Sequence, residues 1–184
     1  MKKPLLLLTL LLSIISVNAQ EETDKTINFV KKNEVKLNSV MLLAGAFEAI
    51  YERNLNQESS VGVSVFVAFD EDSFDESYNY YISPYYRVFF GKKYAAGFFI
   101  EGFGMLNSFE NNYYTYENTF NSPPVLIEED ETNFALGIGL GGKWVTSGGF
   151  VFELNGGVGR NLLDVNDEDN QLVAKFGFNL GYRF

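Results

Sequence analysis

From residue 33 onwards, hydrophobic and polar residues alternate with a period of two in eight segments that are separated by turn-forming residues. This period places successive side chains on opposite faces of a β-strand. It is clearest in the last segment, where one face carries the heavy hydrophobic residues Phe176, Phe178, Leu180, Tyr182 and Phe184. The pattern predicts strands over 33–44, 46–54, 60–69, 78–90, 94–107, 132–144, 150–161 and 172–184.

Most of these segments have about the 9 to 11 residues that a tilted strand needs to cross a bilayer. The connections between them alternate in kind: short turns at 54–59, 91–93 and 145–149 are interleaved with long connections at 70–77, 108–131 and 162–171. The long connections carry many acids and no Lys or Arg. Only the short first connection, near Gly45, departs from this alternation. We therefore predict an antiparallel up-and-down arrangement with periplasmic turns at one end and extracellular acidic loops at the other.

The first residues have the features of a secretory signal peptide. Lys2 and Lys3 precede an apolar run over 4–17, and Val17 and Ala19 supply the small residues that a signal peptidase accepts. A membrane-spanning helix would need about 20 apolar residues, which is more than this run contains. The predicted organisation is a signal peptide over 1–19, a polar lead over 20–32 and one domain over 33–184.

Composition removes most enzyme mechanisms. The chain contains no Cys and no His, which excludes disulfides, histidine-based triads and the usual zinc ligand sets. A net charge of −10 opposes nucleic-acid binding, because phosphates are neutralised by basic surfaces. Paired carboxylates such as Glu48 and Glu101 could in principle act as a general acid and base. Their positions in the alternating pattern of their strands favour a role as salt-bridge partners instead. We expect no catalytic residue, no cofactor and no metal site.

Two segments resemble parts of known proteins. They are the closing segment from Lys175 to Phe184 and the strand-like run from Phe47 to Arg53. Over about residues 33–184 the chain resembles the small eight-stranded outer-membrane barrels, the OmpA-domain and OmpX-like group. The resemblance implies an all-β, eight-stranded antiparallel up-and-down transmembrane β-barrel in the outer membrane of a Gram-negative cell. It also implies a monomer that contacts lipid and lipopolysaccharide and whose C-terminal strand is recognised by the barrel-insertion machinery. It carries over no active site.

Periodicity alone does not say which face lines the interior. A secreted, lipocalin-like barrel would turn its apolar face inward around a ligand, whereas a membrane barrel turns that face to lipid. A narrow barrel has no room for all of the Val, Phe, Leu and Tyr side chains, and glycines recur on the other face. We therefore predict that the glycine-rich face points inward and makes room for long charged side chains. A small pore remains a second alternative.

If the glycine-rich face points inward, the predicted interior carries five acids and five bases. Their balance suits a closed lumen in which buried charges are paired, since an unpaired buried ion costs several kcal/mol. The predicted lumen charge network is Glu34, Lys36, Glu48, Glu52, Arg87, Glu101, Lys143, Glu153, Lys175 and Arg183.

Aromatic residues are predicted near both rims, as in the girdles of membrane barrels. These are Tyr78 and Tyr80 at the outer rim and Trp144, Phe150, Tyr182 and Phe184 at the inner rim.

Three further features invite functional interpretations. The acidic runs 70–76 and 164–170 lack the spacing of an EF-hand, so we favour solvated loops over calcium sites. Arg160 is the only base near the predicted outer rim and could either contact a lipid phosphate or pair with Asp164. The long connection 108–131 mixes aromatics with acids and is either a surface for partner binding or a plain surface loop.

Overall fold

The structure, a computed structural model, describes residues 31–69, 78–115, 125–162 and 172–184. For residues 78, 109–115 and 125–131 it describes the backbone but not the side chains. The predicted signal peptide and most of the polar lead therefore lie outside the described residues. So do most of the acidic connections 70–77 and 162–171.

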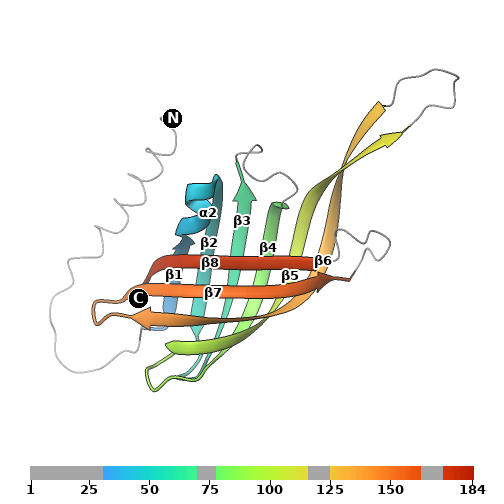
Figure 1. Cartoon of the computed structure of the whole chain (residues 1–184). Helices are drawn as coiled ribbons and strands as arrows, with labels where there is room; N and C mark the ends of the chain where they lie inside the picture. The colour runs from blue at the N-terminus through green and yellow to red at the C-terminus, as the bar shows by residue number, and fades with distance from the viewer. Residues whose placement is uncertain (1–30, 70–77, 116–124, 163–171) are drawn as a thin grey trace, which may run out of the picture. The chain divides into compact units, whose positions relative to one another are not determined.

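The described chain forms a closed barrel in which each strand pairs antiparallel with its neighbours in sequence order (Figure 1). β1 completes the ring by pairing with β8, and at that seam the backbone N–H groups of Asn33 and Phe184 each donate to the carbonyl oxygen of the other residue. The predicted all-β, eight-stranded antiparallel up-and-down barrel is confirmed. The strands are β1 (Asn33–Asn38), β2 (Ala46–Asn54), β3 (Ser59–Ala68), β4 (Tyr78–Phe89), β5 (Gly97–Thr115), β6 (Val125–Val145), β7 (Phe150–Asn161) and β8 (Leu172–Arg183).

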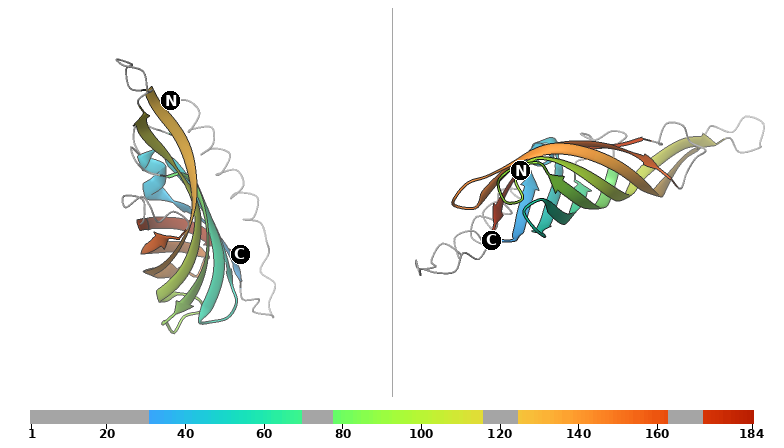
Figure 2. Two further views of the ribbon diagram at one scale, coloured as in Figure 1. Left: turned by 90° about the vertical axis from the view of Figure 1, so that its right-hand side faces the viewer. Right: turned by 90° about the horizontal axis from the view of Figure 1, so that it is seen from below.

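The strands are steeply tilted. In Figure 1, β7 and β8 on the near wall run across the direction of β2, β3 and β4 on the far wall, and the two views of Figure 2 show the same crossing from other sides. Strands in closed barrels tilt by about 35–45° from the axis, so opposite walls cross at a wide angle. Side chains from opposite walls consequently meet in the interior.

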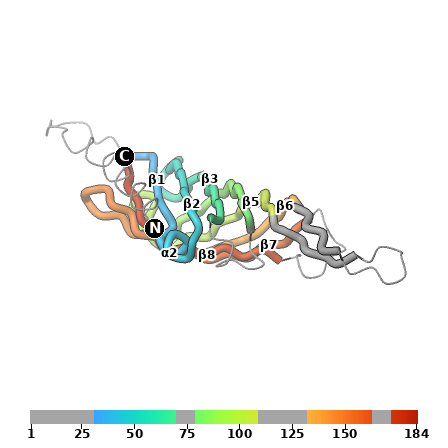
Figure 3. The backbone as a smooth tube through the Cα atoms, turned by 90° about the horizontal axis from the view of Figure 1, so that it is seen from above, coloured from blue at the N-terminus to red at the C-terminus, as the bar shows by residue number. Residues whose placement is uncertain are grey.

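The prediction of a strand over 33–44 is wrong beyond Asn38. A short helix, α2 (Ser39–Ala44), follows β1, and it packs against β8 and β2 (Figure 3). The Asn38 side chain caps the helix by accepting from the backbone N–H groups of Val40 and Met41, and Gly45 ends it with a φ of 95°. Among the described residues, no helix is both long and apolar enough to cross a membrane.

The predicted connection 108–131 is largely strand. β5 continues to Thr115 and β6 begins at Val125, and the two stay paired through the match of Thr115 with Val125. The β4 ladder ends opposite Phe109 and the β7 ladder ends opposite Ala135, so past those points β5 and β6 are paired with each other and, among the described residues, border no other strand. The acidic run Glu128–Glu131 hides this strand in the sequence, because it shows no alternation of hydrophobic and polar residues.

The two faces of the wall differ sharply. Inward-facing side chains are buried and include both polar and apolar residues, whereas outward-facing side chains are mostly exposed and hydrophobic. On β6 and β7, for example, Leu136, Ile138, Leu140, Leu154 and Val158 are all more than half exposed. The outer surface is thus apolar, which is the reverse of a water-soluble barrel.

Candidate functional site

The ten charged residues predicted for the lumen all lie buried inside the barrel, with exposures of 8% or less. Nine of them are joined by ion pairs into one connected cluster, which we call the lumen network. Its members come from every strand except β3. They are Glu34, Lys36, Glu52, Arg87, Glu101, Lys143, Glu153, Lys175 and Arg183.

Glu52 on β2 is the centre of the network. Its carboxylate accepts from Lys36 Nζ at 2.6 Å, from Arg87 Nη1 at 2.8 Å and from Lys143 Nζ at 2.5 Å. The Tyr85 hydroxyl also donates to it, at 2.9 Å. Three cations and a hydroxyl around one carboxylate supply the several partners that a buried ion needs.

Arg87 joins three acids from different strands. Its Nε donates to Glu101 at 2.7 Å, and its Nη1 lies 2.8 Å from both Glu52 and Glu153. The guanidinium carbon also lies 4.2 Å from the ring centre of Tyr85 and 4.3 Å from that of Phe99. The planar cation is therefore held by carboxylates and by aromatic faces, a combination that favours arginine over lysine.

The network reaches the short-turn end of the barrel through Arg183. This residue binds Glu34 at 2.6 Å and donates to the carbonyl oxygens of Tyr94 and Ala95 in the turn between β4 and β5. Ala95 is fully buried and has a φ of 41°, and its N–H donates to Gln57 O. The predicted strand 94–107 therefore begins only at Gly97, because residues 94–96 fold inward to these partners.

Glu48 departs from the other nine residues. It is 6% exposed and accepts from Asn38 Nδ2 at 2.7 Å, but within the described part of the chain no cation lies within ion-pair distance of its carboxylate. The structure therefore places it in the lumen without joining it to the network. The alternation along a strand predicts which face of the wall a side chain lies on. It does not predict how far along the barrel axis that side chain lies from possible partners.

The other half of the interior holds an apolar cluster, which sequence reasoning missed. We call it the apolar plug: Met41, Ala46, Ile50, Phe66, Tyr81, Tyr85, Phe103, Met105, Ala135 and Val173. Phe66 and Tyr81 stack with ring centres 4.8 Å apart. The sequence did hold an indication of this cluster, because its aromatic residues occupy inward-facing positions along β3, β4 and β5. That indication was easy to miss, because aromatic residues are common in β-strands wherever they face.

The inward glycines accommodate rings as well as charges. A Cβ atom on Gly62 would lie 2.4 Å from the Tyr85 ring, and one on Gly137 would lie 2.2 Å from the Phe103 ring. Near the network, a Cβ on Gly181 would lie 2.5 Å from Lys36 Cγ. The expectation that these glycines make room for charged side chains therefore describes only part of their role.

The predicted C-terminal signal residues share the outer face of β8. Phe176, Phe178, Leu180 and Phe184 are 40–57% exposed. Tyr182 is partly covered, because its ring meets Phe150 edge-on with centres 5.8 Å apart, and Lys31 lies over it at 5.2 Å. Of the other predicted girdle residues, Trp144 is 60% and Tyr80 41% exposed, and the Tyr78 side chain lies outside the described residues.

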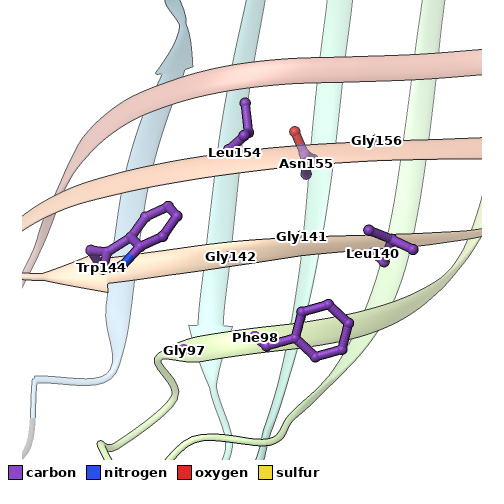
Figure 4. Close-up of a pocket in the computed structure, with 9 residues that line it drawn as sticks. All are labelled: Gly97, Phe98, Leu140, Gly141, Gly142, Trp144, Leu154, Asn155 and Gly156. Atoms are coloured by element: carbon purple, nitrogen blue, oxygen red, sulfur yellow. The ribbon is translucent and has the colours of Figure 1, made fainter.

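The outer wall carries two shallow recesses over β6 and β7. The first, which has a volume of about 560 Å³, is surrounded by Phe98, Leu140, Trp144 and Leu154 (Figure 4). The second, of about 450 Å³, lies further along the same strands and includes Arg160. Neither recess contains the residue types of a catalytic or metal site, and among the described residues no cluster of acids could hold a metal ion. The acidic runs 70–76 and 164–170 and the predicted partner Asp164 lie outside the described residues.

Comparisons with known proteins bear on the fold. No family model matches the chain, and no curated protein matches its sequence. The N-terminal β-barrel domain of Pseudomonas aeruginosa OprF superposes with a TM-score of 0.56 at 13% identity, covering 84% of this chain and 98% of that domain. The Yersinia pestis outer-membrane protein Ail gives a TM-score of 0.38 at 16% identity, over 84% of this chain and 99% of that one. The OprF likeness confirms, at the level of the fold, the resemblance to small eight-stranded outer-membrane barrels.

Proposed function

We propose that this chain is an outer-membrane barrel of a Gram-negative bacterium, exported by a signal peptide over 1–19 and serving a structural or surface-interaction role. The observation that carries the proposal is the inside-out distribution of its side chains. Hydrophobic residues cover the outer wall while the charged residues are buried in the interior. In water this arrangement would expose the apolar wall, whereas in a bilayer it satisfies both faces.

The soluble, lipocalin-like alternative requires the opposite arrangement. Such a barrel would hold an apolar ligand against inward-facing hydrophobic side chains and turn its charges outward. Here the interior is occupied by ion pairs and packed rings, and the exposed side of β6 and β7 is hydrophobic. These features favour the membrane barrel.

A closed lumen is the second part of the proposal. The lumen network fills the half of the interior near the short turns, and the apolar plug fills the half near α2. Ions crossing the barrel would have to displace both, at the cost of breaking several buried ion pairs. The proposed role therefore does not include conduction.

A surface-interaction role is supported by the paired extension of β5 and β6. Past Phe109 and Ala135 each of these two strands has one edge with no neighbouring strand among the described residues. Unpaired strand edges are able to bind an extended segment of another protein. Deleting 110–130 and closing the hairpin with a two-residue turn should leave the barrel folded and abolish any surface binding. Binding that survives the deletion would assign that role to another part of the protein.

Membrane fractionation tests the main proposal. The full-length protein expressed in a Gram-negative host should be recovered in outer membranes, monomeric, with a gel mobility that changes on boiling because an unheated barrel remains compact. Liposome partitioning of the refolded protein is the matched measurement in vitro. Recovery as a detergent-free soluble protein, with mobility unaffected by boiling, would contradict the proposal and favour the lipocalin-like alternative.

A further inference from the structure

The short-turn end of the barrel carries a group of exposed cations. The Lys and Arg side chains of the lumen network are buried, whereas five others are exposed at this end. We call them the basic arc: Lys31, Lys32, Arg53, Lys92 and Lys93. In the part of the chain that the structure describes, none of the five forms an ion pair, and Glu58 is the one acid of this end that lies outside the lumen.

Contacts between neighbouring segments place the members of the basic arc in a row. Lys32 directly precedes Asn33, the first residue of β1, which pairs with Arg53 of β2. The β2–β3 turn then contacts the β4–β5 turn, because Gln57 Nε2 donates to the carbonyl oxygen of Lys92 at 3.1 Å. The basic arc therefore follows the rim of the barrel from β1 through β2 and β3 to the β4–β5 turn.

The β4–β5 turn is fixed over the end of the lumen (Figure 1, lower left). Arg183 of β8, a strand on the opposite side of the ring from β4, donates to the carbonyl oxygens of Tyr94 and Ala95 in this turn. Ala95 is fully buried. Lys92 and Lys93 are thus presented by a backbone that is already ordered, so little conformational entropy is lost when a partner binds them.

The basic arc occupies only one side of this end. The β6–β7 turn on the other side, residues 146–149, contains no charged residue. Lipid headgroups surround a membrane barrel on all sides, so cations that serve headgroups alone would be expected around the whole rim. A row of cations on one side, which continues onto a turn over the lumen, instead matches a linear partner with several negative charges.

We propose that the basic arc binds an extended acidic segment of a periplasmic protein. Neighbouring strands lie about 4.8 Å apart and are tilted, so the rim from β1 to the β4–β5 turn is about 20 Å long, which about six residues of an extended chain span. Acids in such a segment face the cations in turn. The inference rests on the proposed outer-membrane location, which places the short turns in the periplasm.

A labelled peptide of alternating Glu and Thr tests this surface. It should bind the full-length protein in zwitterionic detergent micelles, whereas a peptide of alternating Gln and Thr should not bind. Lys92→Gln combined with Lys93→Gln should weaken binding of the acidic peptide about fivefold or more, because two ion pairs are lost. The matched control, Lys92→Arg combined with Lys93→Arg, keeps both charges and should bind like the wild type. Salt at about 1 M should abolish binding, since it shortens the Debye length to about 3 Å.

A second control removes an exposed base from the opposite end of β7. Arg160→Gln should leave the affinity for the acidic peptide unchanged. Equal affinities for the two peptides, or equal affinities of the Gln and Arg double variants, would overturn the proposal. Binding of purified peptidoglycan or of anionic phospholipid vesicles that requires Lys92 and Lys93, by a protein that does not bind the peptide, would overturn it as well.

Folding and location are measured separately from peptide binding. All variants are first checked for boiling-dependent gel mobility. A wild type that folds and enters membranes but does not bind the acidic peptide refutes this inference alone, whereas failure to enter membranes refutes the proposed function.

Discussion

At the scale of single residues, the ion pairs of the interior are mutually dependent. Arg87 serves Glu52, Glu101 and Glu153 at once, so no single pair can be removed without leaving other buried charges short of a partner. Such networks are costly to break even where an apolar interior would be equally stable. Their contribution is therefore best measured by removing one member.

Replacing Arg87 by Leu should destabilise the barrel by about 3–5 kcal/mol, because three buried carboxylates lose a cation. Replacing Glu101 by Leu should have an effect of similar size, since it deprives Arg87 and Lys175. Urea unfolding of the refolded protein in lipid vesicles gives the free energies. The control Arg53→Leu, at an exposed position, should change stability by less than about 0.5 kcal/mol. Unchanged midpoints for both lumen variants would contradict the account.

Substitution of a glycine by alanine should have different effects on the two faces of the barrel wall. A Cβ atom at Gly137 would lie 2.2 Å from the Phe103 ring and 2.6 Å from the carbonyl oxygen of Val158, so Gly137→Ala should greatly reduce the yield of folded barrel. Gly102, across the wall, has nothing within 4 Å of its Cβ position, and Gly102→Ala should fold normally. Boiling-dependent gel mobility measures both. Normal folding of Gly137→Ala would show that the plug near Phe103 is loosely packed.

At the scale of elements, α2 follows β1 directly, at the point where a longer β1 would have continued to pair with β8. β1 ends at Asn38, so the carbonyls of Phe176 and Phe178 on β8 have no strand partner on that side. Asn38 Nδ2 donates to Phe176 O at 3.0 Å and Ser39 Oγ donates to Phe178 O at 2.8 Å. Two side chains thus supply hydrogen bonds that the missing part of β1 would otherwise provide.

Asn38→Ala should destabilise the barrel by about 2 kcal/mol, because it removes the helix cap together with the bonds to Glu48 and Phe176. Leu43→Ala on the same helix removes a side chain that is 90% exposed and serves as the control. Hydrogen exchange of the β8 amides, measured beside urea unfolding, should show local opening in Asn38→Ala only. Equal effects of the two substitutions would refute a capping role for Asn38.

At the scale of the whole molecule, the interior is filled by two layers of different chemistry. The lumen network lies towards the short turns, where Arg183 reaches the β4–β5 turn, and the apolar plug lies towards α2 through Met41. In the proposed surface-interaction role, this filled barrel supports the connections at the acidic end of the protein.

The protein should accordingly show no single-channel conductance in planar bilayers, since both layers block the lumen. The triple variant Phe66→Ala, Tyr81→Ala and Phe103→Ala removes three of the four rings of the plug but leaves the lumen network, so it should also stay closed. Reproducible conductance steps in the wild type would contradict the closed interior and support the small-pore alternative. Steps in the triple variant alone would assign the closure to the plug.

The sequence was sufficient for the features that depend on neighbouring residues. Period-two alternation predicted the number of strands, their antiparallel order and the facing of residues such as Glu52 and Arg87, because facing follows from position along one strand. Within the described residues it failed over 39–44, over 108–115 and over 125–131. There a capped helix and the mutual pairing of β5 and β6 outweighed the local pattern.

The sequence by itself determined that this chain forms an eight-stranded wall with one apolar and one mixed face, because that information is local. Tertiary structure alone decided that Glu52 meets three cations from three strands, that Glu48 meets no cation among the described residues, and that a plug of rings fills the other half of the interior. It also brought Arg160 of β7 and Leu172 of β8 together at the second recess of the outer wall. The physical reason is that these contacts depend on the tilt and stagger with which the wall closes, and no single strand encodes either quantity.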